Sequence, residues 1–306
     1  MLRRRDLLLA PAAALPARAQ AKARVVIARG ATPDAARVLN ALDRALQACY
    51  ECNSPMEAWK KIARPGEVVG LKVNCLAGRG ASTNNVLVDA ICERLQQAGI
   101  PARDIVIWDR LNADLESAGF RVSTRGDRIR YVGNDSAGYE DELTVSGSAG
   151  SLLARSLTRT CHAVINLPVL KDHGIVGVTM ALKNMFGAIH NPNKYHLTVG
   201  DPYVADVYAM EPIRRKVRLT ICDAITAQYE GGPSFMPQWT WPFQGLIVSR
   251  DPVALDAVGW DIIEKKRAEK GMKPLKAVER EPRYIASAAK RGLGVDRLDL
   301  IERKEV

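Results

Sequence analysis

The chain has 306 residues, 47% of them hydrophobic and 25% charged, and its formal net charge is +10 at pH 7. This length and composition suffice for a sizeable core, in one large domain or two coupled ones. Lysines and arginines are spread along the sequence without a basic stripe or a recognisable module, which argues against nucleic-acid binding and favours the attraction of small anions.

The N-terminus is typical of a removable export signal. Arg3–Arg5 come first, a short apolar stretch follows, and Ala17–Ala19 fits a small-x-small cleavage site. Two arginines directly before Asp6 and a pair of leucines fit the twin-arginine version of the signal. We therefore expect a twin-arginine signal peptide at residues 1–19, handled by the twin-arginine export machinery, and a mature protein, residues 20–306, in the periplasm or beyond. An uncleaved basic N-terminus is the alternative.

Loss of the signal would change the charge only moderately. Residues 1–19 carry four arginines and one aspartate, so their removal lowers the formal charge from +10 to +7. The apolar stretch of the signal is shorter than the roughly 20 residues that span a bilayer, and no later apolar run is long, so we expect no stable membrane insertion.

Short, unbroken apolar runs rich in Val and Ile predict strands that are covered on both faces. They lie at Val25–Ala28, Val68–Val73, Ile105–Trp108, Ala163–Leu167, Val217–Cys222 and Leu246–Val248. Amphipathic segments between them predict helices at Asp34–Cys49, Asn85–Ala98, Pro202–Arg214 and Pro252–Lys266. Asp201 and Asp251 each precede a proline and are expected to be N-caps. The alternation predicts one α/β domain with a mainly parallel sheet and helices on both faces.

One segment does not fit this alternation. Residues Asn112–Gly150 are polar and glycine-rich, and their elements are short, so we expect a small inserted α+β subdomain with some antiparallel pairing. Neither a G-x-G-x-x-G fingerprint nor a P-loop follows any predicted strand, which argues against a nucleotide cofactor of those kinds.

The cysteines give no clear metal site. Cys75, Cys92 and Cys222 lie inside apolar patterns and are expected to be buried free thiols. Cys49 and Cys52 form a single C-x-x-C pair, and without a second pair this favours a disulfide or idle thiols over zinc. The state of this pair stays open.

Polar residues follow five of the predicted strands. In open α/β sheets, ligands bind beyond the carboxyl ends of the strands, so these residues are expected to converge on one site. Any one of them alone fits a helix cap or a turn, and Asp251 in particular fits a cap. The convergent set comprises Lys72, Asn74, Asp109, Lys171, His173, Asp223, Glu230, Gly231 and Asp251.

Lys171 and His173 are the most informative members of this set. They come just after a strand and beside a glycine, where a fixed positive charge and a group that titrates near neutral pH suit an anionic ligand or a proton transfer. Lys183 and Asn184 follow Val178–Leu182, whose apolar spacing predicts a helix. Helical position alone would make Lys183 a solvated side chain and Asn184 a C-terminal residue.

The stretch Asn166–His196 closely resembles the signature of the domain-of-unknown-function 362 family. That signature has a strand, a proline, Lys-x-His, a Thr-containing helix, Lys-Asn-x-x-Gly and a following His. Further segments resemble the family's early Lys-x-Asn strand, its aspartate and Gly-Pro segment, and its Asp-Pro-x-x-x-Asp segment; these are Gly70–Asn74, Asp223–Pro233 and Asp251–Asp256. The resemblance covers most of residues 65–265. It implies a site that includes Lys183, Asn184 and Asp256, and it implies no activity.

Two departures from the family pattern bear on function. Many relatives carry a ferredoxin-like segment with two C-x-x-C-x-x-C-x-x-x-C runs, which suggests electron transfer in some members, and this chain has no such motif. Relatives often have Pro or His where this chain has Asn84 and Asn85, so a ligand contact there is not expected.

Three interpretations of the site stay open. The first is an enzyme that acts on a small anionic substrate, in which Lys72, Lys171 and Lys183 supply charge and His173 is the general acid or base. The second is a non-catalytic periplasmic protein that binds a ligand or assists redox chemistry. The third is structural: the Lys and Asn side chains satisfy buried carbonyls at the sheet edge, and a pocket lined by Lys171, His173 and Lys183 would exclude it.

The cofactor stays unknown at this stage. In the enzyme interpretation Asp109, Asp223 or Asp256 would orient the histidine or hold a divalent metal, although neighbouring lysines repel a cation. His190 and His196 are weak metal candidates because no carboxylate lies close to them in the sequence.

Overall fold

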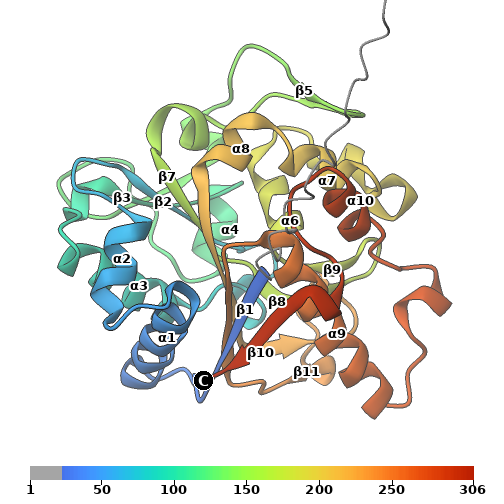
Figure 1. The fold of residues 1–306 in the computed structure, drawn as a ribbon. Helices are drawn as coiled ribbons and strands as arrows, with labels where there is room; N and C mark the ends of the chain where they lie inside the picture. The colour runs from blue at the N-terminus through green and yellow to red at the C-terminus, as the bar shows by residue number, and fades with distance from the viewer. Residues whose placement is uncertain (1–22) are drawn as a thin grey trace, which may run out of the picture.

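The computed structural model describes residues 23–306, so the predicted signal peptide lies outside the described residues. A large sheet forms the centre of the molecule, and helices lie on both of its faces (Figure 1). The strands are β1 (Ala23–Arg29), β2 (Val69–Lys72), β3 (Ile105–Asp109), β4 (Arg130–Gly133), β5 (Thr144–Ser146), β6 (Ala149–Ser151), β7 (Ala163–Asn166), β8 (Val169–His173), β9 (Gly177–Thr179), β10 (Val217–Gln228), β11 (Thr240–Trp241), β12 (Gly245–Ser249) and β13 (Ile301–Glu305). The helices are α1 (Ala35–Tyr50), α2 (Pro55–Ile62), α3 (Asn85–Gln97), α4 (Asn112–Ser117), α5 (Asn134–Ala137), α6 (Ala181–Asn184), α7 (Tyr203–Tyr208), α8 (Glu211–Lys216), α9 (Pro252–Glu269) and α10 (Tyr284–Lys290).

Eleven strands of the described residues form one sheet, whose main path runs β13-β1-β12-β10-β7-β2-β3-β4. Strands β10, β7, β2, β3 and β4 run parallel to one another along this path, and β8 is parallel to β10. Strand β12 runs antiparallel to both β1 and β10. The predicted α/β class with a mainly parallel sheet is therefore confirmed.

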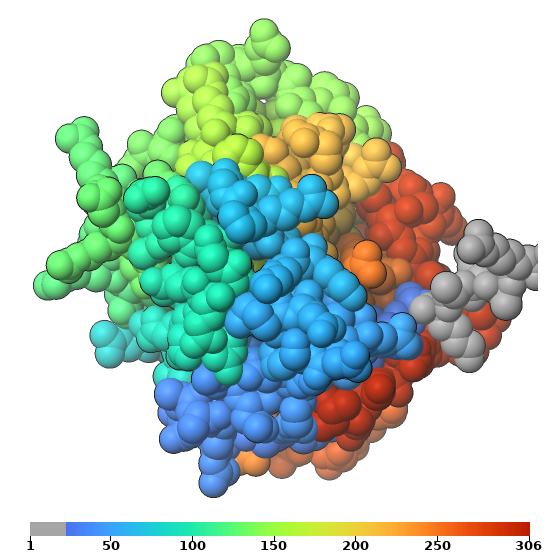
Figure 2. Space-filling model, turned by 60° about the vertical axis from the view of Figure 1, so that its left-hand side comes forward, coloured from blue at the N-terminus to red at the C-terminus, as the bar shows by residue number. Residues whose placement is uncertain are grey.

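The sheet separates two hydrophobic cores. Alternate residues of β1 divide between them, because successive side chains of a strand point to opposite faces: Val25 and Ile27 belong to one core, Val26 and Ala28 to the other. Helices α1, α2 and α3 cover the second core, and Figure 2 shows the surface of this layer in blue and cyan. Helices α6, α7, α9 and α10 cover the first core.

The structure contains strands at all six predicted positions, and β10 extends six residues beyond the prediction, to Gln228. Asp251 caps α9 as expected, since its Oδ1 accepts a hydrogen bond from the Ala254 N–H at 2.8 Å. The prediction for Asp201 was wrong. Its carboxylate accepts a hydrogen bond from the Ser287 hydroxyl instead, and the predicted helix Pro202–Arg214 is broken into α7 and α8 at Met210.

The chain around Lys171, expected to follow a strand, is itself the strand β8. Pro168 has no N–H to donate, so the pairing of β7 stops there, and β8 then pairs with the second half of β10. Strand β8 returns through β9, with Lys171 opposite Thr179. The predicted helix at Val178–Leu182 was also wrong, because its first half belongs to β9 and only Ala181–Asn184 is helical.

The segment predicted as an insertion is shared between the main sheet and a separate hairpin. Strand β4 extends the sheet beside β3, in parallel, while β5 and β6 form an antiparallel two-stranded sheet. None of the helices in residues 23–306 is both long and apolar enough to cross a membrane.

All six cysteines are free thiols in the structure. Cys49 is buried in the core under α1, and Cys52 lies on the outer side, where its sulfur accepts a hydrogen bond from Lys61 Nζ at 3.1 Å. The C-x-x-C pair is therefore not bridged.

Candidate functional site

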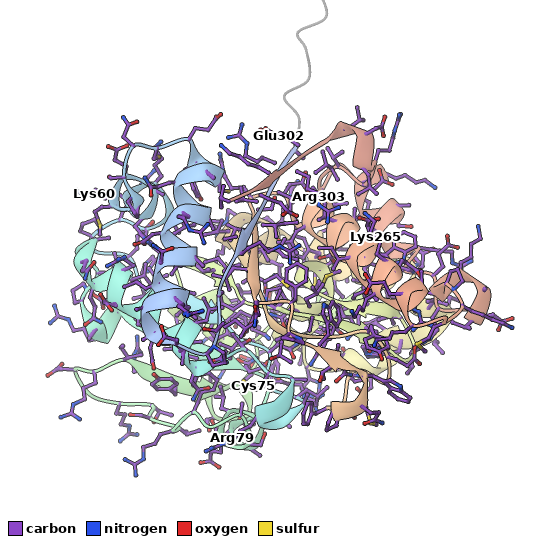
Figure 3. The ribbon with its side chains drawn as sticks, turned by 90° about the horizontal axis from the view of Figure 1, so that it is seen from below. Lys60, Cys75, Arg79, Lys265, Glu302 and Arg303 are labelled. Atoms are coloured by element: carbon purple, nitrogen blue, oxygen red, sulfur yellow. The ribbon has the colours of Figure 1, made fainter. Side chains whose placement is uncertain are left out.

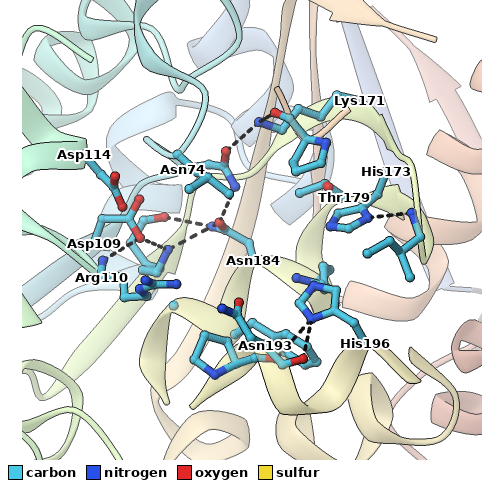
Figure 4. Close-up of a pocket in the computed structure, with 18 residues that line it drawn as sticks. Asn74, Asp109, Arg110, Asp114, Lys171, His173, Thr179, Asn184, Asn193 and His196 are labelled. Atoms are coloured by element: carbon cyan, nitrogen blue, oxygen red, sulfur yellow. Dashed lines mark hydrogen bonds and ion pairs between the residues drawn. The ribbon is translucent and has the colours of Figure 1, made fainter. Parts of the chain in front are cut away.

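A cavity of about 330 Å³ lies at the carboxyl ends of β2 and β3, beside β8 (Figure 4). Its polar lining consists of Lys72, Asn74, Asp109, Arg110, Asp114, Lys171, His173, Thr179, Lys183, Asn184, Asn193 and His196. Leu76, Ile175, Phe186, Gly187, Pro192 and Pro233 complete the wall. The cavity thus brings together the Lys-x-Asn, Lys-x-His and Lys-Asn segments singled out in the sequence.

Lys72 is held at the base of the cavity by an ion pair. Its Nζ lies 2.8 Å from Asp109 Oδ1 and also donates to the carbonyl of Val73 at 2.6 Å. Asp109 Oδ2 in turn accepts the N–H of Cys75 at 2.7 Å. Lys72 and Asp109 are both almost fully buried, so the two charges compensate each other and neither is free for a ligand.

Asn184 joins the strand ends. Its Nδ2 donates to Asn166 Oδ1 at 2.8 Å and to the carbonyl of Lys72 at 3.2 Å, while its Oδ1 accepts from Asn74 Nδ2 at 3.0 Å. These bonds connect α6 with β2 and β7, and Figure 4 shows those to Asn74 and Lys72. Asn184 therefore positions the site.

Gly187 allows the chain after α6 to pass over the Lys72–Asp109 ion pair. A Cβ at this position would lie 2.5 Å from Lys72 Cε and 2.9 Å from Asp109 Oδ1. Because contacts below 3.0 Å force a neighbour to shift, a side chain at residue 187 would displace the ion pair. The glycine of the Lys-Asn-x-x-Gly segment is thus explained by close approach.

Lys171 is anchored rather than free. Its Nζ donates to Asn74 Oδ1 at 2.9 Å, to the Ala81 carbonyl at 2.9 Å and to the Pro233 carbonyl at 3.3 Å. Complete burial lowers its pKa to about 8, against the opposing effect of nearby acidic groups such as Asp109. The three oxygen partners use all three of its donors.

The alternation of β8 separates two kinds of polar side chain. Lys171 and His173 face the cavity, and Asp172 between them points to the other side of the strand, where it pairs with Arg280 and accepts the Gly232 N–H. Because side chains of a strand alternate between its two faces, the lysine and the histidine of the Lys-x-His segment both point into the cavity.

His173 and His196 stack with ring centroids 5.3 Å apart. His173 Nδ1 accepts the backbone N–H groups of Ile175 and Val176, so the neutral ring carries its proton on Nε2. His196 Nδ1 lies 3.1 Å from the Pro192 carbonyl, which assigns the proton of that ring to Nδ1 and leaves Nε2 as an acceptor. The two histidines therefore have opposite tautomers.

The two rings also differ in how strongly they resist protonation. Burial, reinforced by the charge of Lys183, lowers the pKa of His173 to about 2. His196 is less buried, and its pKa is lowered chiefly by burial and next by Lys183. Hence His173 is a neutral hydrogen-bond donor at physiological pH, and of the two only His196 presents a free lone pair.

Lys183 differs from the other two lysines. Its side chain is 9% exposed, and its Nζ lies 4.2 Å from the centre of the Phe186 ring, but it has no hydrogen bond or ion pair within residues 23–306. Burial lowers its pKa to about 7, and Lys72, Lys171 and Arg110 add to this shift. A cavity lined by Lys171, His173 and Lys183 excludes the structural interpretation of the whole site, which accounts for Lys171 and Asn184 alone.

Several lining groups were not singled out in the sequence. Arg110 and Asp114 line the cavity, and neither side chain has a hydrogen bond or ion pair in the described part of the chain. The Thr179 hydroxyl is buried and has no partner there either. The position of Arg110, directly after the strand-end Asp109, was the available signal; Asp114 fell in the segment interpreted as an insertion.

Other candidates lie outside the cavity lining and contact the protein itself. Asp223 accepts the N–H groups of Asn84 and Ile225, and Asp251 accepts those of Ala254 and Val295. Asp256 accepts the N–H groups of Ala181 and Leu182.

Glu230 pairs with Arg267 and Arg280, and Gly231 packs against Trp239. His190 packs edge-on against Tyr139 and does not line the cavity, whereas His196 does. Within the described residues, no group of three or more His, Cys, Asp or Glu could hold a metal ion.

Comparisons with known proteins place the chain in a family. Residues 69–261 match the family described as "Domain of unknown function (DUF362)". The thylakoid-associated protein sll1697 of Synechocystis sp. is 28% identical over 225 residues, which are 69% of this chain and 67% of that protein.

Two solved structures are more distant. A crystal structure of a Thermotoga maritima protein has a TM-score of 0.45 at 9% identity. The match covers 77% of this chain and 59% of the Thermotoga chain. The lactate racemase apoprotein of Thermoanaerobacterium thermosaccharolyticum has a TM-score of 0.37 at 12% identity. This match covers 64% of this chain and 50% of the racemase chain. Similarities of this size carry no inference about activity. The match of the family signature over residues 69–261, well over half of the sequence, shows that the chain belongs to the DUF362 family.

Proposed function

We propose that this protein binds a small organic anion in the cavity between β2, β3 and β8, and that it does so after export. The observation that carries the binding proposal is a pair of basic side chains, Lys183 and Arg110, that line the cavity without a hydrogen bond or ion pair in the described part of the chain. Four cationic side chains and two carboxylates line the cavity, and Asp109 is already paired with Lys72. A bound anion would supply the charge that the site lacks.

The remaining lining indicates an organic ligand. Leu76, Ile175 and Phe186 contribute apolar surface, and the Thr179 hydroxyl offers a polar group without a partner. A volume of about 330 Å³ is at the lower end of the range of roughly 300–1,000 Å³ typical of ligand pockets. A carboxylate on a small apolar body suits these properties better than a bare inorganic ion.

The histidine pair supports an enzyme over a passive binder. His173 Nε2–H can donate a hydrogen bond to the ligand, and His196 Nε2 can accept a proton from it. We therefore transfer the general-base role proposed for His173 to His196. A non-catalytic periplasmic binding protein remains the second candidate, in which both histidines act as hydrogen-bonding groups alone.

Thermal unfolding in the presence of small anions tests the binding proposal. Benzoate, pyruvate, succinate and phosphate are suitable probes, and a ligand at 100 times its Kd should stabilise the fold by about 2.7 kcal/mol. Lys183→Met and Arg110→Gln should each weaken the stabilisation at least tenfold in Kd. Lys60→Met is the matched control, because Lys60 is exposed on α2 (Figure 3) and does not line the cavity.

Two results would contradict the proposal. One is a wild-type protein that none of the anions stabilises. The other is an equal response of wild type, Lys183→Met and Arg110→Gln to the same anion.

The export proposal is supported by the order of basic, apolar and small residues in 1–19. Replacing both Arg4 and Arg5 by lysine should keep the charge, abolish export and leave the full-length precursor in the cytoplasm. Mass spectrometry of the periplasmic fraction should detect a chain that begins at or near residue 20. Unchanged export of the double-lysine variant would contradict a twin-arginine signal.

A further inference from the structure

The three lysines of the cavity are chemically different. Lys72 and Lys171 each have three oxygen partners within hydrogen-bonding distance, whereas Lys183 has none within residues 23–306. Its amine is nine-tenths buried and lines the cavity. A lysine in this position has donors and, once neutral, a lone pair that the protein does not use.

The surroundings of Lys183 favour a neutral amine. The groups facing it include the cations Lys72, Lys171 and Arg110 and the two stacked histidines. The carboxylates in the same lining are Asp109, which pairs with Lys72, and Asp114. Burial and these cations place the pKa of Lys183 at about 7, so a large fraction of the amine is unprotonated at neutral pH. Only an unprotonated amine is nucleophilic.

We propose that Lys183 forms an imine with the carbonyl group of a small carboxylate-bearing ligand, such as a 2-oxo acid. This inference rests on the proposed anion binding and names the ligand class for the same cavity. The ligand carboxylate would lie near Arg110, and its carbonyl carbon near Lys183 Nζ. Both residues line the one cavity, which suits a ligand that carries a carboxylate and a carbonyl group.

The step balances without an added oxidant or reductant. The lone pair of Nζ forms a C–N bond to the carbonyl carbon, and the C=O π electrons move to the oxygen. The two amine protons are transferred, one by one, to that oxygen, which departs as water and leaves a C=N bond. His196 Nε2 can relay these protons, and His173 Nε2–H can donate a hydrogen bond to the oxygen as its charge grows.

Reductive trapping tests the imine directly. The full-length protein is incubated with pyruvate or 4-carboxybenzaldehyde and sodium cyanoborohydride, which reduces the imine to a stable amine, and peptides are mapped by mass spectrometry. The expected result is an adduct at Lys183 and little at the exposed Lys60. The neutral fraction of an amine of pKa about 7 rises about tenfold between pH 6 and pH 8, so the initial rate of adduct formation should rise by about the same factor at cyanoborohydride concentrations where attack by the amine limits the rate.

Matched ligands and variants separate this inference from anion binding. Benzoate has the carboxylate of 4-carboxybenzaldehyde without the aldehyde, so it should stabilise the fold and give no adduct. Lys183→Arg keeps the positive charge but cannot form an imine, so it should still be stabilised by benzoate and give no adduct. Lys183→Met serves as a second variant if the arginine does not fit.

The outcomes are distinct. An adduct at Lys183 that is lost in the variants supports the imine. Stabilisation of the wild type by benzoate and pyruvate, with no adduct or with equal labelling of Lys60, overturns the imine and leaves anion binding intact. Absence of both stabilisation and adduct overturns the proposed function together with the inference.

Discussion

Asp256 Oδ1, on the long helix α9, accepts a 2.7 Å hydrogen bond from the backbone N–H of Ala181, the first residue of the short helix α6. Its second oxygen accepts the next N–H, that of Leu182, at 3.1 Å. Asp256 thus accepts hydrogen bonds from the free N–H groups at the start of α6, as an N-cap residue does, although it belongs to α9. Since α6 carries Lys183 and Asn184, this contact sets the position of the site from outside the cavity.

Removing the Asp256 carboxylate should therefore loosen the site. Asp256→Ala leaves two buried N–H groups without a partner, at about 1–3 kcal/mol each, so the free energy of unfolding in urea should fall by about 2–6 kcal/mol. Asp261→Asn, on the same helix but in surface ion pairs with Lys265 and Arg303, is the control and should cost about 1 kcal/mol or less. Equal losses in the two variants would contradict this role for Asp256.

Lys183 should impose a pH dependence on stability. Its pKa is 10.5 in an unfolded chain and about 7 in the fold, so between these values the unfolded state binds the extra proton. The free energy of unfolding should therefore increase as the pH rises from about 7 to about 10.5, and Lys183 should add no such increase below about pH 7.

Lys183→Met removes this dependence, and urea unfolding at two pH values measures it. The variant should be at least as stable as the wild type at pH 6, and its advantage should shrink at pH 9. Lys171, whose pKa of about 8 acts in the same direction, is present in both proteins and cancels in the comparison. A variant that is less stable than wild type at pH 6 would show that Lys183 has a compensating partner.

The histidine pair should be visible by NMR of the imidazole nitrogens. His173 is expected to remain neutral with its proton on Nε2 throughout pH 5–8, because burial and Lys183 lower its pKa to about 2. His196 is expected to carry its proton on Nδ1 and to titrate below its ordinary value. Titration of His173 near pH 6 would contradict its lowered pKa, and a proton on its Nδ1 would rule out the assigned tautomer.

Two aspartates of the cavity should respond differently to neutralisation. Asp109→Asn leaves Lys72 as an unpaired buried charge, so the loss of stability should be about 3–5 kcal/mol. Asp114→Asn removes a carboxylate that has no ion pair within residues 23–306, so stability should change by about 1 kcal/mol or less. Both variants make the net charge of the cavity more positive, so both should bind benzoate with a lower Kd. Calorimetry measures this Kd, and weaker binding by Asp114→Asn would contradict an anion site.

Much of the sheet was predictable because its strands are buried on both faces. Such strands appear as unbroken apolar runs, as Ile105–Trp108 does, and the structure has β3 there. Strand β8 was not recognised, because its sequence VLKDH places two charged residues in a strand whose partners are known only from the fold. The pairing with the second half of β10, beyond Pro168, is a long-range contact that local patterns do not encode.

The candidate site was predictable to the extent that strand ends converge. That rule located Lys72, Asp109 and Lys171, but it could not tell a carboxylate that faces a cavity from one that accepts backbone N–H groups. Asp223 and Asp251 belong to the second kind. Their short side chains reach nearby N–H groups whose positions depend on loops, and sequence spacing does not fix those loops.

The interruption at Pro168 has a consequence for how the protein should respond to a ligand. Up to Leu167, whose N–H bonds to the Lys72 carbonyl, β2 is joined to its neighbour by backbone hydrogen bonds; beyond it, β8 pairs with β10 and β9 instead. The sheet therefore forks, the cavity occupies the fork, and the bond from Lys171 Nζ to Asn74 Oδ1 bridges its two branches. A ligand in the fork would add further contacts between the two branches. Its binding should slow amide hydrogen exchange on both β3 and β8, although only side chains connect them there.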